Sequence, residues 1–89
     1  MVKTILKFYA DWCGPCKVMS MNLKGTNLNN IDLKEINIDD DANEELVSKY
    51  NIRNIPLTVL LDENDEVLEK IVGVMPASKI NETLAKYAE

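Results

Sequence analysis

The sequence predicts an α/β fold in which a four-stranded mixed sheet carries helices on both of its faces. Two observations lead to this class. Short β-branched and apolar segments alternate with segments whose apolar residues recur at helical spacing, in the order β-α-β-α-β-β-α. The chain has 89 residues, which suffices for one compact core but not for two, so we expect a single domain over residues 1–89.

The first half of the chain predicts two strands with a helix between them. Residues 2–9 are β-forming and apolar apart from two lysines and a threonine, which is typical of a buried parallel strand. Apolar residues at helical spacing predict a helix over residues 16–23, with Gly25 as its C-terminal cap. After an Asn-rich loop, residues 33–39 alternate in polarity and predict the second strand.

The second half predicts a short helix, a hairpin and a final helix. Residues 41–44, Asp-x-x-Glu, resemble a capping box and predict the start of a short helix that runs through Tyr50 and is stopped by Asn51. Residues 55–61 predict a third strand, and a turn over residues 62–65 returns the chain as a fourth strand over residues 66–72. Apolar residues along one face of residues 76–87 predict the last helix.

The connections predict the order of the strands in the sheet. Right-handed crossovers place the second and third strands on either side of the first, and the hairpin adds an antiparallel edge. The expected order is therefore 2-1-3-4, with the third strand parallel to the first. In this arrangement the first strand is central, and its C-terminal end lies where open α/β sheets place their functional sites.

The charge of the chain argues against two classes of partner. Fifteen acidic residues against ten basic ones give a net charge of −5. Binding to nucleic acid or to an anionic membrane surface requires a basic face, so we expect neither as a partner. No apolar run is long enough to span a membrane, and the N-terminus does not resemble a signal peptide. We therefore expect a cytoplasmic monomer.

Both cysteines lie in residues 12–16, Trp-Cys-Gly-Pro-Cys, directly after the first predicted strand. Cys13 is expected at the start of the helix, where unpaired N–H groups and the positive helix end favour its thiolate. Cys16 follows one turn later, within disulfide reach and more buried. We therefore predict Cys13 as the attacking nucleophile and Cys16 as the thiol that resolves the mixed disulfide. Gly14 permits tight geometry, and Pro15 stiffens the loop.

Two other uses of the cysteine pair are disfavoured. A structural zinc ion usually needs four protein ligands, whereas the chain has two cysteines and no histidine. A permanent disulfide is unusual in the cytoplasm. We expect no bound metal or organic cofactor, because the redox-active Cys13–Cys16 pair would itself carry two electrons as a dithiol and release them on forming its disulfide.

Several segments of the chain resemble the thioredoxin family. Residues 10–17, Ala-Asp-Trp-Cys-Gly-Pro-Cys-Lys, are similar to the family's active-site segment, and residues 37–39, 51–56 and 72–73 match strings further along. The similarity runs from about residue 5 to the end of the chain, and the extra strand and helix with which thioredoxins usually begin have no counterpart. The resemblance implies the thioredoxin fold and a thiol–disulfide oxidoreductase that reduces protein disulfides. It also implies a thioredoxin reductase, or an equivalent reductant, as a partner.

The resemblance further implies a substrate-binding surface around the cysteines. Pro56 would be a cis-proline beside the disulfide, which would leave the Ile55 backbone free to pair with an extended substrate. Trp12 would flank the sulfurs as an apolar contact, or merely pack as a half-buried aromatic. Gly73 would let substrate approach the backbone, or simply end a strand. The implied binding set is Trp12, Gly14, Pro15, Ile55, Pro56 and Gly73.

Two positions depart from the family pattern. Thioredoxins commonly bury an aspartate that assists proton transfer at the second cysteine, and this position holds Lys7. The lysine that usually lies close to that aspartate is replaced by Glu35. Because a buried charge must be paired, we interpret the two residues as an exchanged pair in which Glu35 is the carboxylate near Cys16. The alternative is that both side chains extend to solvent from strand ends.

Two other functions remain open from the sequence. A glutaredoxin-like protein recycled by glutathione would fit the short length, although the Cys-Gly-Pro-Cys motif and the Ile before Pro56 favour thioredoxin. A binding module or subunit that uses the thioredoxin fold would not need its cysteines, and the intact Cys13 and Cys16 argue against it. The sequence does not identify the reductant, which could be an NADPH flavoprotein, a ferredoxin-linked reductase or glutathione.

Overall fold

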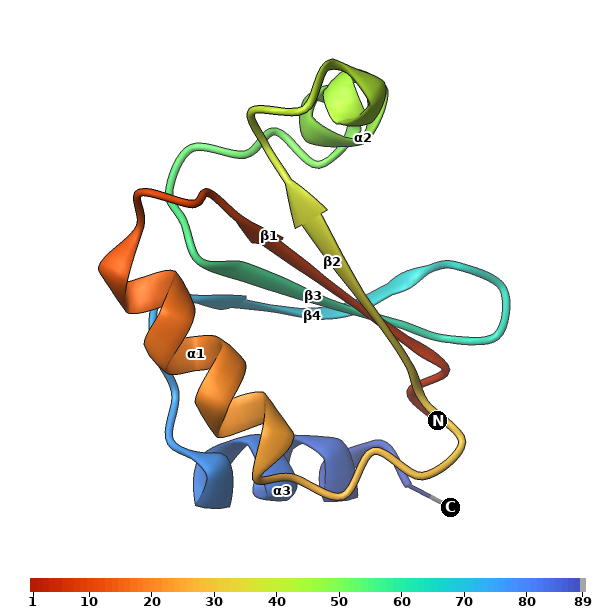
Figure 1. Cartoon of the computed structure of the whole chain (residues 1–89). Coiled ribbons are helices and arrows are strands. Elements are labelled where there is room, and N and C mark those ends of the chain that lie inside the picture. Colours follow the sequence, from red (N-terminus) through yellow and green to blue (C-terminus); the bar gives the residue numbers. More distant parts are fainter. Residues whose placement is uncertain (89) are drawn as a thin grey trace.

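The elements follow the predicted order in the computed structural model, which describes residues 1–88 (Figure 1). Strand and helix boundaries shift by one or two residues from the sequence prediction at most ends, and α2 is shorter than expected. The elements are β1 (Thr4–Tyr9), α1 (Gly14–Lys24), β2 (Asp32–Asn37), a 3₁₀ turn (Asp41–Asn43), α2 (Glu44–Lys49), β3 (Leu57–Leu61), β4 (Val67–Val72) and α3 (Ala77–Lys86).

The sheet has the predicted order β2-β1-β3-β4, but the predicted direction of β3 is wrong. β1 pairs with β2 in parallel, whereas β3 is antiparallel to β1, and β4 is antiparallel to β3. The reason is the length of α2. Its six residues rise only about 9 Å, less than half of the roughly 20 Å that a six-residue strand spans. Figure 1 shows α2 beyond the end of β2, so the chain enters β3 from the edge at which β2 ends.

The direction of β3 decides which residues meet at the cysteine end of the sheet. Phe8, near the end of β1, lies opposite Leu57, the first residue of β3. Pro56 therefore lies beside the segment that leads from β1 to Cys13. A parallel β3 would have carried Pro56 to the far end of the sheet.

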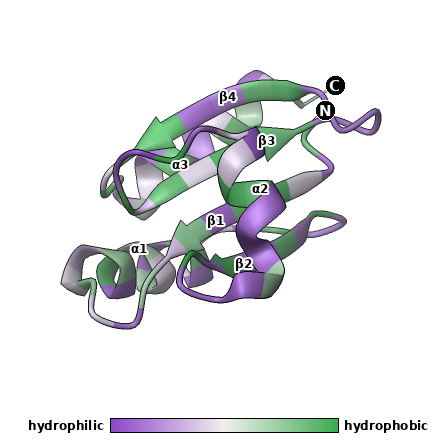
Figure 2. Cartoon of the chain, turned by 90° about the horizontal axis from the view of Figure 1, so that it is seen from above, coloured by the Kyte–Doolittle hydropathy of each residue, from purple (hydrophilic) through white to green (hydrophobic). Residues whose placement is uncertain are grey.

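Two helices cover one face of the sheet and the third covers the other. α1 and α3 pack on the side that Ile5 and Leu60 face, together with Met19, Leu23 and Ile80. α2 packs on the opposite side, where the core is built from Leu6, Phe8, Ile36, Tyr50, Leu57, Val59 and Leu61. In Figure 2 hydrophobic segments lie on the strands, interrupted on β4 by a hydrophilic part, and the turn between β3 and β4 is hydrophilic. The helices on both faces confirm the predicted class. Within residues 1–88, no helix combines the length and apolar character needed to cross a membrane.

The ends of the first two helices differ in detail from the sequence prediction. The carboxylate that caps the turn before α2 belongs to Asp40, which accepts a hydrogen bond from the N–H of Ala42 at 2.9 Å, so the predicted capping box from Asp41 is wrong. α2 ends where Asn51 adopts a positive φ of 51°. Gly25 does follow α1, but with a right-handed φ of −82° rather than the left-handed conformation of a typical glycine cap.

Candidate active site

The cysteine segment begins where β1 ends and places Cys13 at the N-terminal cap of α1. Its Sγ accepts a hydrogen bond from the N–H of Cys16 at 3.2 Å, one of the donors that the first turn of a helix leaves unpaired. Pro15 lies in this first turn, where a residue without an N–H loses nothing. Packing does not require glycine at position 14, because a Cβ added to Gly14 would meet no atom within 4 Å. The loop is thus left open on its outer side.

Cys13 and Cys16 form a disulfide, with their Cα atoms 5.3 Å apart. Both side chains are buried, and Cys16, at 1% exposure, is covered more completely than Cys13, at 5%. They form a small apolar cluster with Ala10, against which Tyr9 and Ile55 pack. The helix end therefore presents Cys13 at the edge of this cluster and encloses Cys16 beneath it.

The loop before β3 supplies the neighbouring wall. The Ile55–Pro56 peptide bond is cis, as the resemblance implied, and Ile55 packs against the cysteine cluster. Gly73, directly after β4, donates its N–H to the carbonyl of Pro56 at 2.9 Å. Gly73 has a φ of +81°, a conformation that glycine adopts readily and other residues rarely. Pro56 and Gly73, predicted as site residues from separate parts of the sequence, are thus joined by a backbone hydrogen bond.

Trp12 directly precedes Cys13 in the chain and is 71% exposed, so the half-buried alternative is wrong. Its indole Nε1 donates a hydrogen bond to Oδ2 of Asp39 at 2.9 Å. Asp39 follows β2 and was not predicted as a site residue. The signal that could have identified it is the indole N–H itself, which usually requires an acceptor when the ring is held in place.

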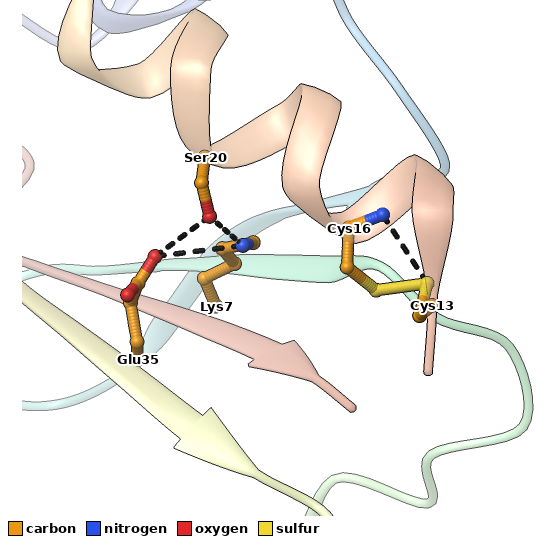
Figure 3. Close-up of polar contacts among 5 residues, drawn as sticks. All are labelled: Lys7, Cys13, Cys16, Ser20 and Glu35. Carbon is orange, nitrogen blue, oxygen red and sulfur yellow. Dashed lines mark hydrogen bonds and ion pairs between the residues drawn. A yellow bond between two sulfur atoms is a disulfide. The ribbon is translucent and has the colours of Figure 1, made fainter. Parts of the chain in front are cut away.

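Lys7 and Glu35 lie directly opposite each other on the paired strands β1 and β2. Lys7 Nζ and Glu35 Oε1 are 3.4 Å apart, so the exchanged pair is formed. The Ser20 hydroxyl on α1 accepts a hydrogen bond from Lys7 and donates one to Glu35 Oε1 at 2.9 Å (Figure 3). Lys7 does not extend to solvent, because its side chain is 2% exposed, whereas that of Glu35 is 45% exposed. Ser20 was not predicted as a site residue. Its position four residues after Cys16, on the same face of the helix, is the signal that could have identified it.

The lysine, the glutamate and the serine share a pocket of about 160 Å³ with Cys16. Tyr9, Ala10, Asp11 and Lys17 complete its lining. The polar cluster therefore lies in the surroundings of the second cysteine, in a pocket that neither Trp12 nor Pro56 lines. Within residues 1–88, no three His, Cys, Asp or Glu side chains gather as a metal site would require.

Comparisons with known proteins agree with this geometry. The family model described as Thioredoxin matches residues 2–86. The thioredoxin of Bacillus subtilis is 38% identical over 81 residues, which cover 90% of this chain and 77% of the relative. The thioredoxin of Mycoplasmoides gallisepticum is 33% identical over 82 residues, covering 92% and 81%. The solved structure of a mutant thioredoxin from Halobacterium salinarum superposes with a TM-score of 0.81 at 28% identity, covering 97% of this chain and 74% of that one.

Proposed function

This chain belongs to the thioredoxin family and is a thiol–disulfide oxidoreductase that reduces protein disulfides, and we propose that Cys13 is its nucleophile and Cys16 its resolving cysteine. The observation that carries these roles is the place of the Cys13 sulfur at the N-terminal cap of α1. A thiolate there accepts the N–H of Cys16 and faces the positive end of the helix.

The reaction transfers two electrons in two displacements. The Cys13 thiolate attacks one sulfur of the substrate disulfide, a mixed disulfide forms, and the departing substrate sulfur takes a proton. Cys16 then loses its proton and attacks the Cys13 sulfur, which releases the second substrate thiol. The products are a substrate dithiol and the Cys13–Cys16 disulfide that the structure holds.

We propose that substrate binds on the surface formed by Trp12, the Ile55–Pro56 loop and Gly73. Trp12 offers an exposed apolar ring beside the disulfide. Ile55 lies against the cysteine cluster, and an extended substrate segment can pair with its backbone. An added Cβ at Gly73 would meet no atom within 4 Å, which supports close approach of substrate to the backbone there. Gly14 and Pro15 form the outer side of the loop.

We propose that Glu35 accepts the proton of Cys16, with Lys7 as its partner. The shared pocket and the exposure of Glu35, which allows exchange of protons with solvent, support this role. Replacing Glu35 with Gln should slow disulfide exchange at neutral pH. Unchanged exchange rates, together with an unchanged Cys16 titration, would remove Glu35 from the mechanism.

The remaining assignments follow from the same chemistry. The Cys13–Cys16 dithiol carries both electrons and becomes the disulfide when it gives them up, so we propose that the protein needs no bound cofactor; a thioredoxin reductase or equivalent donor restores the dithiol. We propose that the protein works as a monomer in the cytoplasm, within electron transport and redox homeostasis, without nucleic acid or membrane as a partner. The net charge of −5 supports the last point.

Reduction of a model disulfide protein tests the function. The expected result is turnover driven by NADPH and a thioredoxin reductase; turnover only with glutathione and glutathione reductase would favour the glutaredoxin-like alternative. Cys16→Ser should accumulate mixed disulfides at Cys13, and Cys13→Ser should accumulate none. A thioredoxin-fold binding module would instead keep its partners after both thiols are blocked.

A further inference from the structure

Among residues 1–88, Lys7 is the one charged residue that is buried. It lies on the side of the sheet that α1 covers. The two charges of its pair with Glu35 are solvated unequally, because the glutamate side chain is 45% exposed and that of the lysine only 2%. Water screens the carboxylate, whereas the ammonium lies in a medium of low dielectric constant. The pair therefore leaves a positive field inside the protein.

Ser20 fixes the position of this ammonium along α1. Its hydroxyl accepts a hydrogen bond from Lys7 Nζ, and it follows Cys16 by four residues on the same helix. Residues four apart share a helix face, with Cβ atoms about 5–6 Å apart. Lys7 Nζ is therefore held about one helical turn from Cys16, and the two residues line the same pocket. Figure 3 shows both side chains beside α1.

Apart from Glu35 on β2, the groups that face the pocket do not cancel the positive charge of Lys7. The ring of Tyr9, on β1, lies with its centroid 5.3 Å from Nζ, and an aromatic face favours a cation. Asp11 and Lys17 also line the pocket, but both are exposed and carry opposite charges. From β3, Thr58 lies opposite Lys7 and contributes only a neutral hydroxyl. Glu35 is the carboxylate that opposes Lys7 directly, and its 45% exposure lets water screen it.

We propose that the Lys7 ammonium stabilises the thiolate of Cys16 in the reduced protein and thereby raises the reduction potential of the Cys13–Cys16 couple. This inference rests on the oxidoreductase function proposed above. In the disulfide, the Cys16 sulfur is uncharged and gains little from a cation. On reduction two electrons enter, the S–S bond breaks, and a Cys16 sulfur that releases its proton to Glu35 or solvent carries a negative charge. A cation that stabilises only the reduced form makes the couple more oxidising.

Equilibration of the purified protein with glutathione tests the proposal. Two glutathione thiols supply two electrons and two protons, and the protein dithiol and glutathione disulfide form. Lys7→Met removes the charge but keeps the length of the side chain, and the half-exposed Glu35 stays hydrated. We expect the equilibrium constant for reduction to fall about tenfold, equivalent to a potential lower by about 30 mV. Glu35→Gln, which removes the negative charge beside Lys7, should shift it in the opposite direction.

Two further variants make the result specific. Lys34→Met removes an exposed lysine from the neighbouring strand β2 and should leave the potential unchanged. Ser20→Ala should lower the reduction potential as Lys7→Met does, but by a smaller amount. If Lys7→Met does not fold, the potential of Ser20→Ala tests the proposal in its place. The ultraviolet absorbance of the Cys16 thiolate should appear at higher pH in Lys7→Met than in the unmodified protein.

The proposal would be overturned if the equilibrium constant for reduction of Lys7→Met lay within about twofold of that of the unmodified protein. It would also be overturned if Lys7→Met and Glu35→Gln shifted this constant in the same direction. The measurement uses no protein substrate and no reductase. A failure here would therefore leave reduction of a model disulfide protein intact, whereas failure of the proposed function would abolish that turnover.

Discussion

Replacing Asp39 with Ala should release Trp12 from its fixed position beside the disulfide. Trp12 is 71% exposed, so packing restrains its ring only weakly. The hydrogen bond from its indole Nε1 to Asp39 Oδ2, at 2.9 Å, holds the ring in one position on the proposed substrate-binding surface. Without the carboxylate, we expect the ring to sample several rotamers.

The expected loss of kcat/KM in Asp39→Ala follows from the free-energy cost of immobilising the Trp12 side chain. A substrate that packs against a mobile Trp12 must immobilise it, which costs about 0.5–1.5 kcal/mol. Since about 1.4 kcal/mol is tenfold in affinity, a cost near 1 kcal/mol predicts a fall in kcat/KM of about fivefold. The loss should lie in KM, because neither cysteine is touched. The melting temperature should change little, since both partners are exposed.

Turnover and fluorescence together provide the assay. Reduction of a model disulfide protein gives kcat and KM, and Trp12 is the chain's single tryptophan, so its fluorescence anisotropy reports the motion of that ring alone. Asp39→Asn keeps an oxygen acceptor and should recover most of the activity. Asp32→Ala removes a carboxylate from the far end of β2 and serves as the matched control. If Asp39→Ala loosens the ring but leaves KM unchanged, fixing Trp12 does not assist substrate binding.

Three further predictions concern stability. Thr58→Val should raise the free energy of unfolding by about 1 kcal/mol, because the buried Thr58 Oγ1 has no hydrogen-bond partner among the described residues; a destabilised variant in denaturant titrations would contradict this. Gly73→Ala should lower the same quantity by about 1–2 kcal/mol, owing to its φ of +81°, and an unchanged unfolding midpoint would show that the loop adapts. Hydrogen bonds from Lys86 and then Tyr87 lower the pKa of Glu69 below its usual 4.5. A carboxylate with a lowered pKa stabilises the fold above its unfolded-state pKa, and this stability is lost as pH falls through the folded-state pKa. Glu69→Gln should therefore flatten the loss of stability below about pH 4.5; an unaltered acid unfolding curve would count against it.

The sequence predicted the elements well because each depends on local pattern. The period of apolar residues identified the helices, and the charged turn over residues 62–65 separated β3 from β4; there Asp62 accepts hydrogen bonds from the N–H groups of Asn64 and Glu66. The direction of β3, in contrast, is not determined by local sequence pattern. It depends on whether the segment between β2 and β3 can travel back along the sheet, and α2, at six residues, is too short to do so.

The parts of the candidate site that sequence reasoning missed are those defined by tertiary contact. Ser20 and Asp39 carry side chains that are common on exposed helices and after strands, so their types gave no signal. What distinguishes them is the partner that folding delivers: Lys7 and Glu35 for Ser20, and the Trp12 indole for Asp39. The pair of Lys7 and Glu35 could be inferred from sequence because two departures from one family pattern compensate in charge.

The antiparallel course of β3 explains how so short a chain brings together three segments that are distant in the sequence: the cysteine segment, the Pro56 loop and Gly73. With β3 reversed, its first residues lie at the edge where β1 ends, and the last residues of β4 lie opposite them, with Val72 facing Leu57. Gly73 can then reach the Pro56 carbonyl directly. A parallel β3 would have separated the cysteines from the Pro56 loop by the length of a strand, about 17–20 Å. The direction of one strand therefore determines whether the Pro56 loop and Gly73 lie beside the disulfide, where we propose that substrate binds.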